Sequence, residues 1–206
     1  MTVSTIVASK DASLLSTAPT TNTGSDQNID LGYLNSTTRF NGILFFDASA
    51  INALGNTVTS AILSLYYYAK GAGYNTTRTH VISRVTQDDW IESEVTWNKR
   101  NASTNWAAGG GDYTGTDAVN ASVDTTPGEW ITWDITNIVN YCMANQSKHV
   151  NLLLQVTSGA LNNDDSLFYS KDYVTDPTLR PKLDITYTPA PPGGSPIFFD
   201  GGMALA

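Results

Sequence analysis

The strongest constraint on the fold of this chain is a repeated alternation of apolar and polar residues in short runs. In one run, residues 28–34, Ile29, Leu31 and Tyr33 fall on one face, because successive side chains of a strand point to opposite sides. The runs are rich in Val, Thr, Tyr and Phe, which favour strands. They cover residues 3–7, 28–34, 40–46, 61–68, 81–86, 130–133, 150–156, 166–169 and 183–187. Many short strands with turn residues between them predict an all-β protein, a jelly-roll β-sandwich or a barrel.

One segment, residues 134–145, has a helical pattern instead. Its apolar side chains recur at i, i+3, i+4 and i+7, at Ile135, Ile138, Val139 and Cys142, which is the spacing of one helix face. Asp134 or Thr136 is suited to cap the first turn. We expect a short helix that closes one end of the sandwich. Cys142 then lies on the buried face as an inert core thiol rather than a nucleophile, because no basic residue is near it in sequence.

Turn-forming residues predict two long loops, over residues 16–27 and 98–128. The domain boundaries follow from the end of the strand pattern. Residues 1–188 are predicted to form the sandwich, residues 189–194 (PAPPGG) a Pro/Gly linker, and residues 195–206 a C-terminal extension.

The C-terminal extension is apolar and nearly uncharged. Its large side chains are Ile197, Phe198, Phe199, Met203 and Leu205. Exposed apolar residues on a free tail favour aggregation unless another surface covers them, so these five are predicted to bind a partner, as extended peptides do at a sheet edge or in a groove. The alternative is that the tail folds back on its own domain.

The charge balance excludes some partners. Eleven Lys and Arg against nineteen Asp and Glu give a formal net charge of −8, which repels phosphate groups and disfavours nucleic acid and anionic membranes. The chain contains no apolar run of 18 residues that could span a bilayer. Its first residues lack the basic start and apolar stretch of a secretory signal. We therefore expect a protein that is made in the cytoplasm and either stays there or leaves by another route.

Carboxylates cluster around Trp90, at Asp88, Asp89, Glu92 and Glu94. Two of them could serve as the acid and base of a glycosidase. We favour a structural role, in which one carboxylate caps a turn or pairs with Arg84 or Arg180. No catalytic residue is predicted.

Metal ligands are sparse. An oxygen-rich stretch, Asn162, Asn163, Asp164 and Asp165, and the separate residues Asp11, Asp26 and Asp30 could offer oxygen ligands to Ca²⁺. An ordinary Asn/Asp turn is the favoured interpretation, so no cofactor is expected, with structural Ca²⁺ left open. His80 and His149 lie far apart in sequence and lack a third ligand.

Aromatic residues offer candidate contacts for a glycan or a partner, because rings bind sugar faces. Four tryptophans are assigned to the core, Trp90, Trp97, Trp130 and Trp133. Trp106 and Tyr113 lie in a Gly-rich stretch and cannot easily reach a core, so we predict that they contact a glycan or partner. Tyr74, beside a turn, is the third candidate.

Two motifs carry a resemblance to a known family. The first is W-x-E-x-x-V-T-W, formed by Trp90, Glu92, Val95, Thr96 and Trp97, and the second is R-P-x-L-x-[IV]-x-Y, formed by Arg180, Pro181, Leu183, Ile185 and Tyr187. With the blocks between them, the chain resembles the DNRLRE domain, named for disaggregatase-related proteins and similar to carbohydrate-binding module family 96, over about residues 11–187. The resemblance implies a jelly-roll β-sandwich without catalytic activity, used as an appended module on secreted bacterial and archaeal proteins, often polysaccharide enzymes.

Three functions compete. The first is a structural protein of a virion, a bacteriophage capsid decoration protein or another head or tail surface component, which would be a symmetric oligomer bound to copies of itself and to other virion proteins. It explains the standalone domain, the low charge content and the apolar tail. The alternative is an extracellular carbohydrate-binding module of a polysaccharide-active protein, which rests on the resemblance. A polysaccharide-cleaving enzyme is the least favoured.

Overall fold

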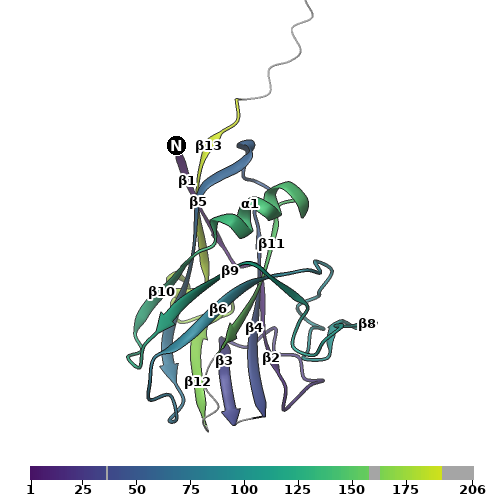
Figure 1. The fold of residues 1–206 in the computed structure, drawn as a ribbon, viewed down its shortest axis with the longest axis vertical. Coiled ribbons are helices and arrows are strands. Elements are labelled where there is room, and N and C mark those ends of the chain that lie inside the picture. Colours follow the sequence, from purple (N-terminus) through teal and green to yellow (C-terminus); the bar gives the residue numbers. More distant parts are fainter. Residues whose placement is uncertain (36, 158–162, 192–206) are drawn as a thin grey trace, which may run out of the picture.

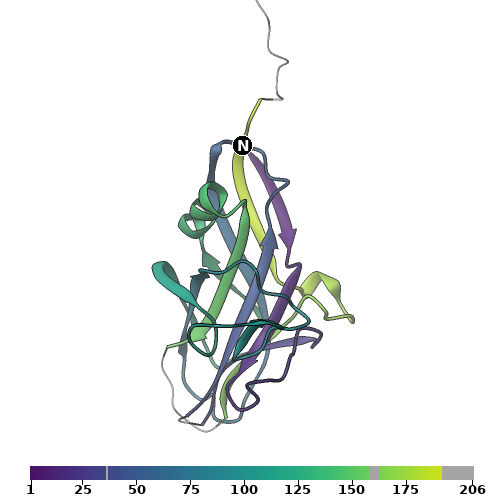
Figure 2. The same cartoon turned by 90° about the vertical axis from the view of Figure 1, so that its right-hand side faces the viewer.

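The computed structural model describes residues 1–35, 37–157 and 163–191, and it is an all-β sandwich whose described residues include one α-helix (Figures 1 and 2). The predicted fold class is therefore confirmed. The predicted tail, residues 195–206, lies outside the described residues.

All described strand pairings are antiparallel. The main sheet runs in the order β1-β13-β5-β12-β3-β4-β11-β6-β9, with β10 paired to β5 and β2 paired to β4, and β7 and β8 form a separate hairpin. The strands are β1 (Thr2–Val7), β2 (Lys10–Leu15), β3 (Asn28–Asn35), β4 (Thr38–Asp47), β5 (Ala53–Lys70), β6 (Arg78–Val85), β7 (Lys99–Asn101), β8 (Thr104–Asn105), β9 (Tyr113–Val123), β10 (Glu129–Asp134), β11 (His149–Val156), β12 (Asp164–Tyr169) and β13 (Lys182–Pro189). A 3-10 helix, η1, covers Pro177–Leu179.

The core forms where the predicted alternation places it. Along β5, the side chains of Ala61, Leu63, Leu65 and Tyr67 are fully buried, whereas those on the other face, such as Tyr66, remain partly exposed. The buried face packs against apolar residues of β3, β4, β6, β11, β12 and β13 in one continuous cluster. Burial of this apolar area is the main favourable term for folding.

The helix α1 (Thr136–Asn145) lies near the end of the sandwich where β1 begins (Figure 1). The four residues of its predicted apolar stripe are all buried, at Ile135, Ile138, Val139 and Cys142. Asp134 Oδ1 accepts hydrogen bonds from the backbone N–H and the hydroxyl of Thr136. The N-cap residue is nevertheless Ile135, with no side-chain capping bond, so the predicted cap at Asp134 or Thr136 is wrong. The predicted helix, its buried stripe and the burial of Cys142 are confirmed.

A second apolar cluster lies on the opposite face of the sheet that contains β2, β4, β6 and β11. It joins residues of those strands to Trp90, Val95 and Trp106, which belong to residues 86–112. We call residues 86–112 the covering segment, because it places a third, mostly irregular layer over the sheet. In Figure 1 this segment includes β8 and lies beside β4 and β2.

The prediction of a continuous loop over residues 98–128 is wrong. This stretch contains β7, β8 and the eleven-residue strand β9. β9 is an edge strand that pairs only with β6, and its pairing is irregular opposite Ser83. Asp117 within it has a φ of 62°. An edge strand tolerates such residues because one side of its ladder is free, which explains why its sequence lacks a clear strand pattern.

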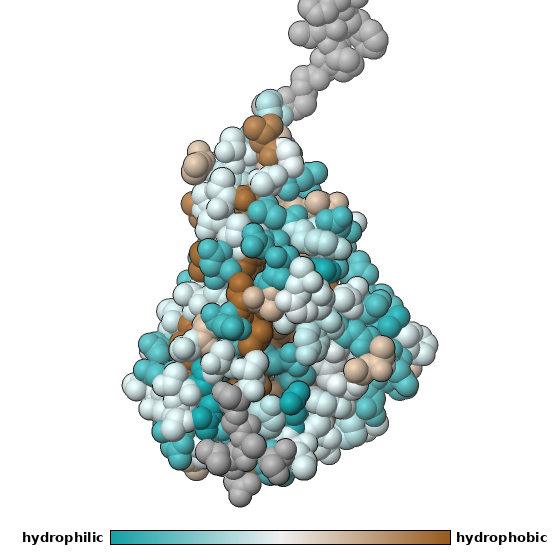
Figure 3. All heavy atoms as spheres, in the orientation of Figure 1, coloured by the Kyte–Doolittle hydropathy of each residue, from teal (hydrophilic) through white to brown (hydrophobic). Residues whose placement is uncertain are grey.

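The surface is mainly polar. On the face shown in Figure 3, hydrophobic side chains gather in a narrow strip near the middle, surrounded by hydrophilic residues. No helix within the described ranges is both long and apolar enough to cross a lipid bilayer.

Candidate functional site

A cleft lies where the covering segment meets the ends of β3 and β4. It has a volume of about 420 Å³, within the range of small-molecule sites. Its walls come from widely separated segments: Ser16, Tyr33, Thr37, Arg39, Asn41, Trp97, Ala108, Gly109, Gly110, Gly111, Tyr113 and Gln155. We call it the Tyr113 cleft.

Three glycines build one wall of the Tyr113 cleft, and two of them lie directly on the indole of Trp97. A Cβ atom on Gly109 would clash with Trp97 Nε1, and one on Gly110 would meet Trp97 Cη2 at 2.8 Å. A Cβ atom on Gly111 would instead meet Leu153 Cδ1 at 2.9 Å. Gly110 and Gly111 also have φ angles of 93° and 104°, in a region that side chains disfavour. Glycine is therefore required here both for space and for backbone conformation.

Hydrogen bonds hold this wall in place. The backbone N–H of Gly110 donates to the carbonyl of Trp97 at 2.7 Å, and Asn41 Nδ2 donates to the carbonyl of Gly110 at 2.9 Å. The carboxylate of Asp112 accepts bonds from the backbone N–H groups of Ala107 and Ala108, which closes the turn. The wall is thus fixed before any ligand binds, which lowers the entropic cost of binding.

The cleft combines aromatic rings with neutral hydrogen-bonding groups. Its lining residues include no carboxylate, and Arg39 is their one charged side chain; the Arg39 guanidinium lies 5.2 Å from the ring centroid of Tyr33. Asn41 is 2% exposed, and its Oδ1 has no hydrogen-bond partner. A buried amide oxygen without a partner is costly, so it is a natural acceptor for a hydroxyl group or water that enters the cleft.

Tyr113 is the exposed aromatic residue of this site. Its side chain is 48% exposed, and it lines two further hollows that adjoin the cleft, of about 280 and 190 Å³. The cleft and the hollows together form a groove on both sides of Tyr113, with Gln155 and Thr157 on one side and Thr86 and Gln87 on the other. The structure therefore places the predicted residue Tyr113 at the centre of a groove.

The other two predicted aromatic contacts are not at the surface. Trp106 is 5% exposed and belongs to the cluster under the covering segment, where its Nε1 donates to the carbonyl of Thr96. Tyr74 is 1% exposed, and its hydroxyl donates to the carbonyl of Val123. The expectation that Trp106 cannot reach a core is wrong, because the covering segment forms a small core of its own.

The tryptophans assigned to the core are mostly where the sequence predicts. Trp90 and Trp133 are fully buried, whereas Trp97 and Trp130 keep part of their surface. Trp97 stays partly exposed because its ring lines the cleft beside Gly109 and Gly110. It is therefore a residue of the cleft that the sequence alone did not reveal.

The first sequence motif serves to attach the covering segment to the sheet. Trp90 Nε1 donates to Asn151 Oδ1 of β11 at 2.7 Å. Glu92 Oε1 accepts the backbone N–H of Asp11 at 2.7 Å and lies 3.2 Å from Lys171 Nζ. The structural role predicted for this acidic cluster is consistent with these contacts. Its partners differ from those predicted, because Glu92 pairs with Lys171 and Asp89 pairs with Arg100.

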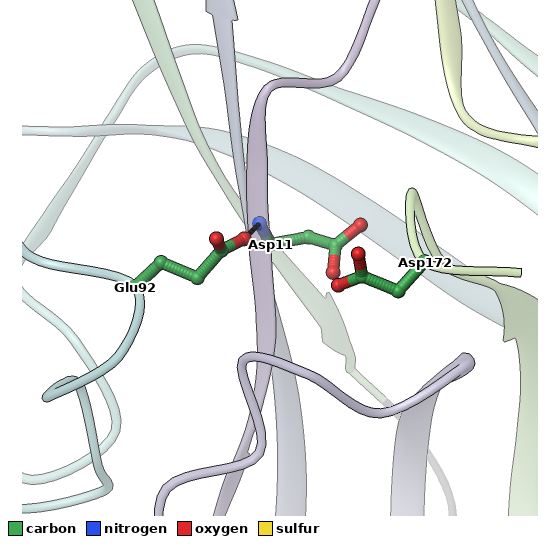
Figure 4. A group of neighbouring side chains, drawn as sticks. All are labelled: Asp11, Glu92 and Asp172. Carbon is green, nitrogen blue, oxygen red and sulfur yellow. Dashed lines mark hydrogen bonds between the residues drawn. The ribbon is translucent and has the colours of Figure 1, made fainter.

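Three carboxylates, Asp11, Glu92 and Asp172, lie close together at this attachment point, with ligand atoms within 4.8 Å of one another. Figure 4 shows Glu92 reaching the backbone of Asp11, while the carboxylates of Asp11 and Asp172 point toward each other. Burial raises the pKa of Asp11 to about 7. The ammonium of Lys171 lies 2.8 Å from Asp172 Oδ2 as well as near Glu92. Lys171 thus supplies a positive charge among these carboxylates. We therefore interpret the cluster as a structural contact that attaches the covering segment, rather than as a metal site.

The predicted oxygen-rich stretch is also structural where the structure describes it. Asp164 is buried and forms a two-oxygen hydrogen-bonded pair with Arg78, whose Nη2 lies 2.7 Å from Asp164 Oδ2. Asn162 lies outside the described residues.

His80 is buried, and its Nε2 shares a 2.6 Å hydrogen bond with Ser166 Oγ. Ser166 Oγ also lies within hydrogen-bonding distance of the carbonyl of Leu31. This pair lies inside the sandwich core, away from the Tyr113 cleft, so it does not form a reactive serine site.

A second group of aromatic residues covers part of the outer sheet face. The rings of Tyr66, Tyr68 and Tyr173 are all within 10° of parallel to that of Tyr169, with centroid separations from 3.6 to 5.8 Å. In this stacked arrangement the rings cover much of one another's faces, so less of each face is available to a ligand. They are therefore a weaker platform for a sugar ring than the exposed Tyr113.

The five predicted partner-binding residues of the tail, Ile197, Phe198, Phe199, Met203 and Leu205, lie outside the described residues. Their docking role stays a prediction.

Comparison with known proteins gives one family. A search of curated proteins returned no match. The family model of the disaggregatase related repeat domain matches residues 11–185. This range includes the first motif, the second motif as far as Ile185, all the strands from β3 to β12, and the whole Tyr113 cleft. The chain therefore belongs to the disaggregatase related repeat domain family, as its sequence motifs predict.

Proposed function

We propose that this protein is a non-catalytic carbohydrate-binding module and that the Tyr113 cleft holds the glycan. The observation that carries the proposal is the position of Tyr113, an exposed ring at the centre of a groove lined mainly by amide, hydroxyl and glycine groups, with Arg39 in the cleft and Asp112 in one adjoining hollow. Sugars present apolar C–H faces and many hydroxyl groups, so they bind best where a ring and neutral hydrogen-bonding groups converge.

The shape of the groove favours a chain over a single sugar. The Tyr113 cleft continues into hollows on two sides, so consecutive residues of a polysaccharide can contact Tyr113, Gln155 and Arg39 together. Arg39 is the one charged side chain in the lining of the cleft, so at this position the cleft favours a neutral or anionic group of the glycan over a cationic one. The net charge of −8 opposes densely anionic chains at longer range.

The chemistry of the cleft favours binding without cleavage. Hydrolysis of glycosides commonly uses two carboxyl groups about 5–10 Å apart across the sugar. The lining of the Tyr113 cleft includes no carboxylate, and Glu92 and Glu94 are engaged elsewhere, Glu94 with the backbone N–H of Ala102. The virion role stays a prediction, since the tail on which it depends lies outside the described residues.

The experiment is affinity electrophoresis through gels that contain one polysaccharide each, from a panel of neutral and anionic types including alginate and pectin. We expect at least one to retard the wild type and the Tyr113→Ala variant to lose roughly tenfold or more in affinity. Tyr141→Ala is the matched control, because Tyr141 is also an exposed tyrosine (40%) but lies on α1, outside the cleft. Equal losses in both variants, or no retardation by any polysaccharide, would contradict the proposal.

A further inference from the structure

The edge of the main sheet formed by β1 presents unpaired backbone groups. β1 is the first strand in the sheet order and, among the residues that the structure describes, pairs only with β13. Its six residues, TVSTIV, include no charge and no proline, whereas natural edge strands are usually protected by one or the other. Figure 2 shows β1 at the margin of the molecule, beside β13.

The register with β13 identifies which backbone groups are free. Ala8 N donates to Pro181 O, which continues the pairing of Val7 with Lys182. Because hydrogen-bonded positions alternate in an antiparallel pair, Thr2, Ser4 and Ile6 direct their backbone groups to β13. The backbone N–H and C=O groups of Val3, Thr5 and Val7 therefore point away from β13, toward the open edge of the sheet.

These three residues also leave apolar surface uncovered. Val3 is 64% exposed and Val7 is 59% exposed. Both lie on the same face of β1 as Thr5, since the three alternate along the strand. The free ladder positions and the exposed valines thus belong to the same three residues.

We propose that two copies of this chain associate through β1, in an antiparallel pair centred on Thr5. In this register Thr5 lies opposite Thr5 of the second copy, and Val3 lies opposite Val7. All three outward-facing residues then form hydrogen-bonded pairs, the valines cover one another, and the two sheets become one. The arrangement is a two-fold symmetric, self-complementary interface.

The neighbouring charges allow this register. On the face of the sheet shared with Val3 and Val7, β13 places Thr186 beside Val3, Asp184 beside Thr5 and Lys182 beside Val7. The two Asp184 carboxylates face each other across the two-fold axis, but three strand spacings, about 14 Å, separate them, which exceeds the Debye length at physiological salt. The net charge of −8 on each copy opposes association, and salt screens that repulsion. The dimer is therefore expected to tighten as salt is added. The inference does not rest on glycan binding, because β1 and β9, which carries Tyr113, lie at opposite ends of the sheet order.

Sedimentation velocity on the full chain, at concentrations up to about 1 mM, tests the dimer. We expect a monomer–dimer equilibrium, and Thr5→Lys is expected to weaken it by roughly tenfold or more because two ammonium groups then meet at the axis. Lysine is common on natural edge strands, so the variant should fold. The comparison is repeated with Asp184→Asn in both proteins, because the Asp184 carboxylate lies beside Thr5 and would otherwise neutralise the new lysine. Thr186→Lys is the control, because it adds the same charge to the same face but on β13. A wild type that stays monomeric, or a Thr5→Lys variant that still dimerises, would overturn the proposal.

A cross-link tests the register itself. Hydrogen-bonded antiparallel pairs have Cα atoms about 5.5 Å apart, within the disulfide range of about 4.4–6.8 Å. Under mild oxidation, Thr5→Cys should therefore give a covalent dimer, whereas Thr186→Cys, one strand further from the axis in each copy, should not. The native thiol, Cys142, is buried and does not compete. Equal cross-linking of the two variants would also overturn the proposal.

Discussion

Replacing His80 should remove a large part of the acid sensitivity of this fold. The imidazole is 1% exposed and lies among Tyr74, Phe168 and Ser166, with Nε2 in a 2.6 Å hydrogen bond to Ser166 Oγ. Burial lowers the pKa of His80 to about 4, from 6.5 in the unfolded chain. Between these two values the unfolded chain binds a proton that the folded protein does not, so stability falls as the pH decreases.

The magnitude follows from the two pKa values. One pH unit corresponds to about 1.4 kcal/mol, so His80 should cost the wild type roughly 2.5 kcal/mol between about pH 7.5 and pH 4.5. Asp11 acts in the opposite direction, because its raised pKa, about 7, makes the folded state bind a proton before the unfolded chain does. A comparison of wild type with His80→Gln cancels the contribution of Asp11, since both proteins retain it.

Urea unfolding followed by tryptophan fluorescence at several pH values measures this difference. We expect His80→Gln to be less stable than wild type near pH 7.5 and to lose roughly 2.5 kcal/mol less on acidification to about pH 4.5. Parallel pH curves for the two proteins would refute the argument, because they would mean that His80 is protonated equally in the folded and unfolded states.

Three further predictions concern the covering segment and the core. Trp90→Phe removes the donor to Asn151 Oδ1 and should lower the free energy of unfolding by about 1–3 kcal/mol in urea titration; an unchanged midpoint would mean that this bond contributes nothing. Gly110→Ala places a Cβ 2.8 Å from Trp97 at a φ of 93°, so it should lower the free energy of unfolding and weaken glycan binding in affinity electrophoresis. Gly115→Ala is the control, because a Cβ there meets nothing within 4 Å, and it should change glycan binding little. Burial raises the pKa of Cys142 to about 12, so the native protein should resist a thiol reagent near pH 8 and react once urea unfolds it; fast labelling of the native protein would contradict the buried position.

The strands could be predicted because alternation reports which face of a strand is buried. The runs at 28–34 and 61–68 lie inside β3 and β5, with the expected residues in the core. β2 escaped prediction because it is only six residues long and half of its buried positions are polar. Ala12 and Leu14 pack under the covering segment. Asp11 and Ser13, on the other face, are buried by hydrogen bonds to distant segments, which the sequence pattern does not reveal.

The site was harder to predict because it depends on contacts between distant segments. Trp106 lies in a Gly-rich stretch that has no apolar pattern of its own, and its burial requires the covering segment to pack on β4 and β11. An aromatic residue in a Gly-rich stretch is expected to be exposed. This holds for Tyr113, which follows the covering segment directly, but not for Trp106, which lies inside it and is buried. The glycines themselves were noted in the sequence, but their role depends on the Trp97 ring beneath them.

The most direct test of glycan binding at the Tyr113 cleft is a ¹H–¹⁵N spectrum of the labelled protein, titrated with an oligosaccharide from whichever polysaccharide retards it. We predict that the largest shifts are those of the amides of Gly109, Gly110, Gly111, Tyr113 and Gln155. Largest shifts at the stacked tyrosines Tyr66, Tyr68, Tyr169 and Tyr173, or on α1, would contradict the account and place the glycan on another surface.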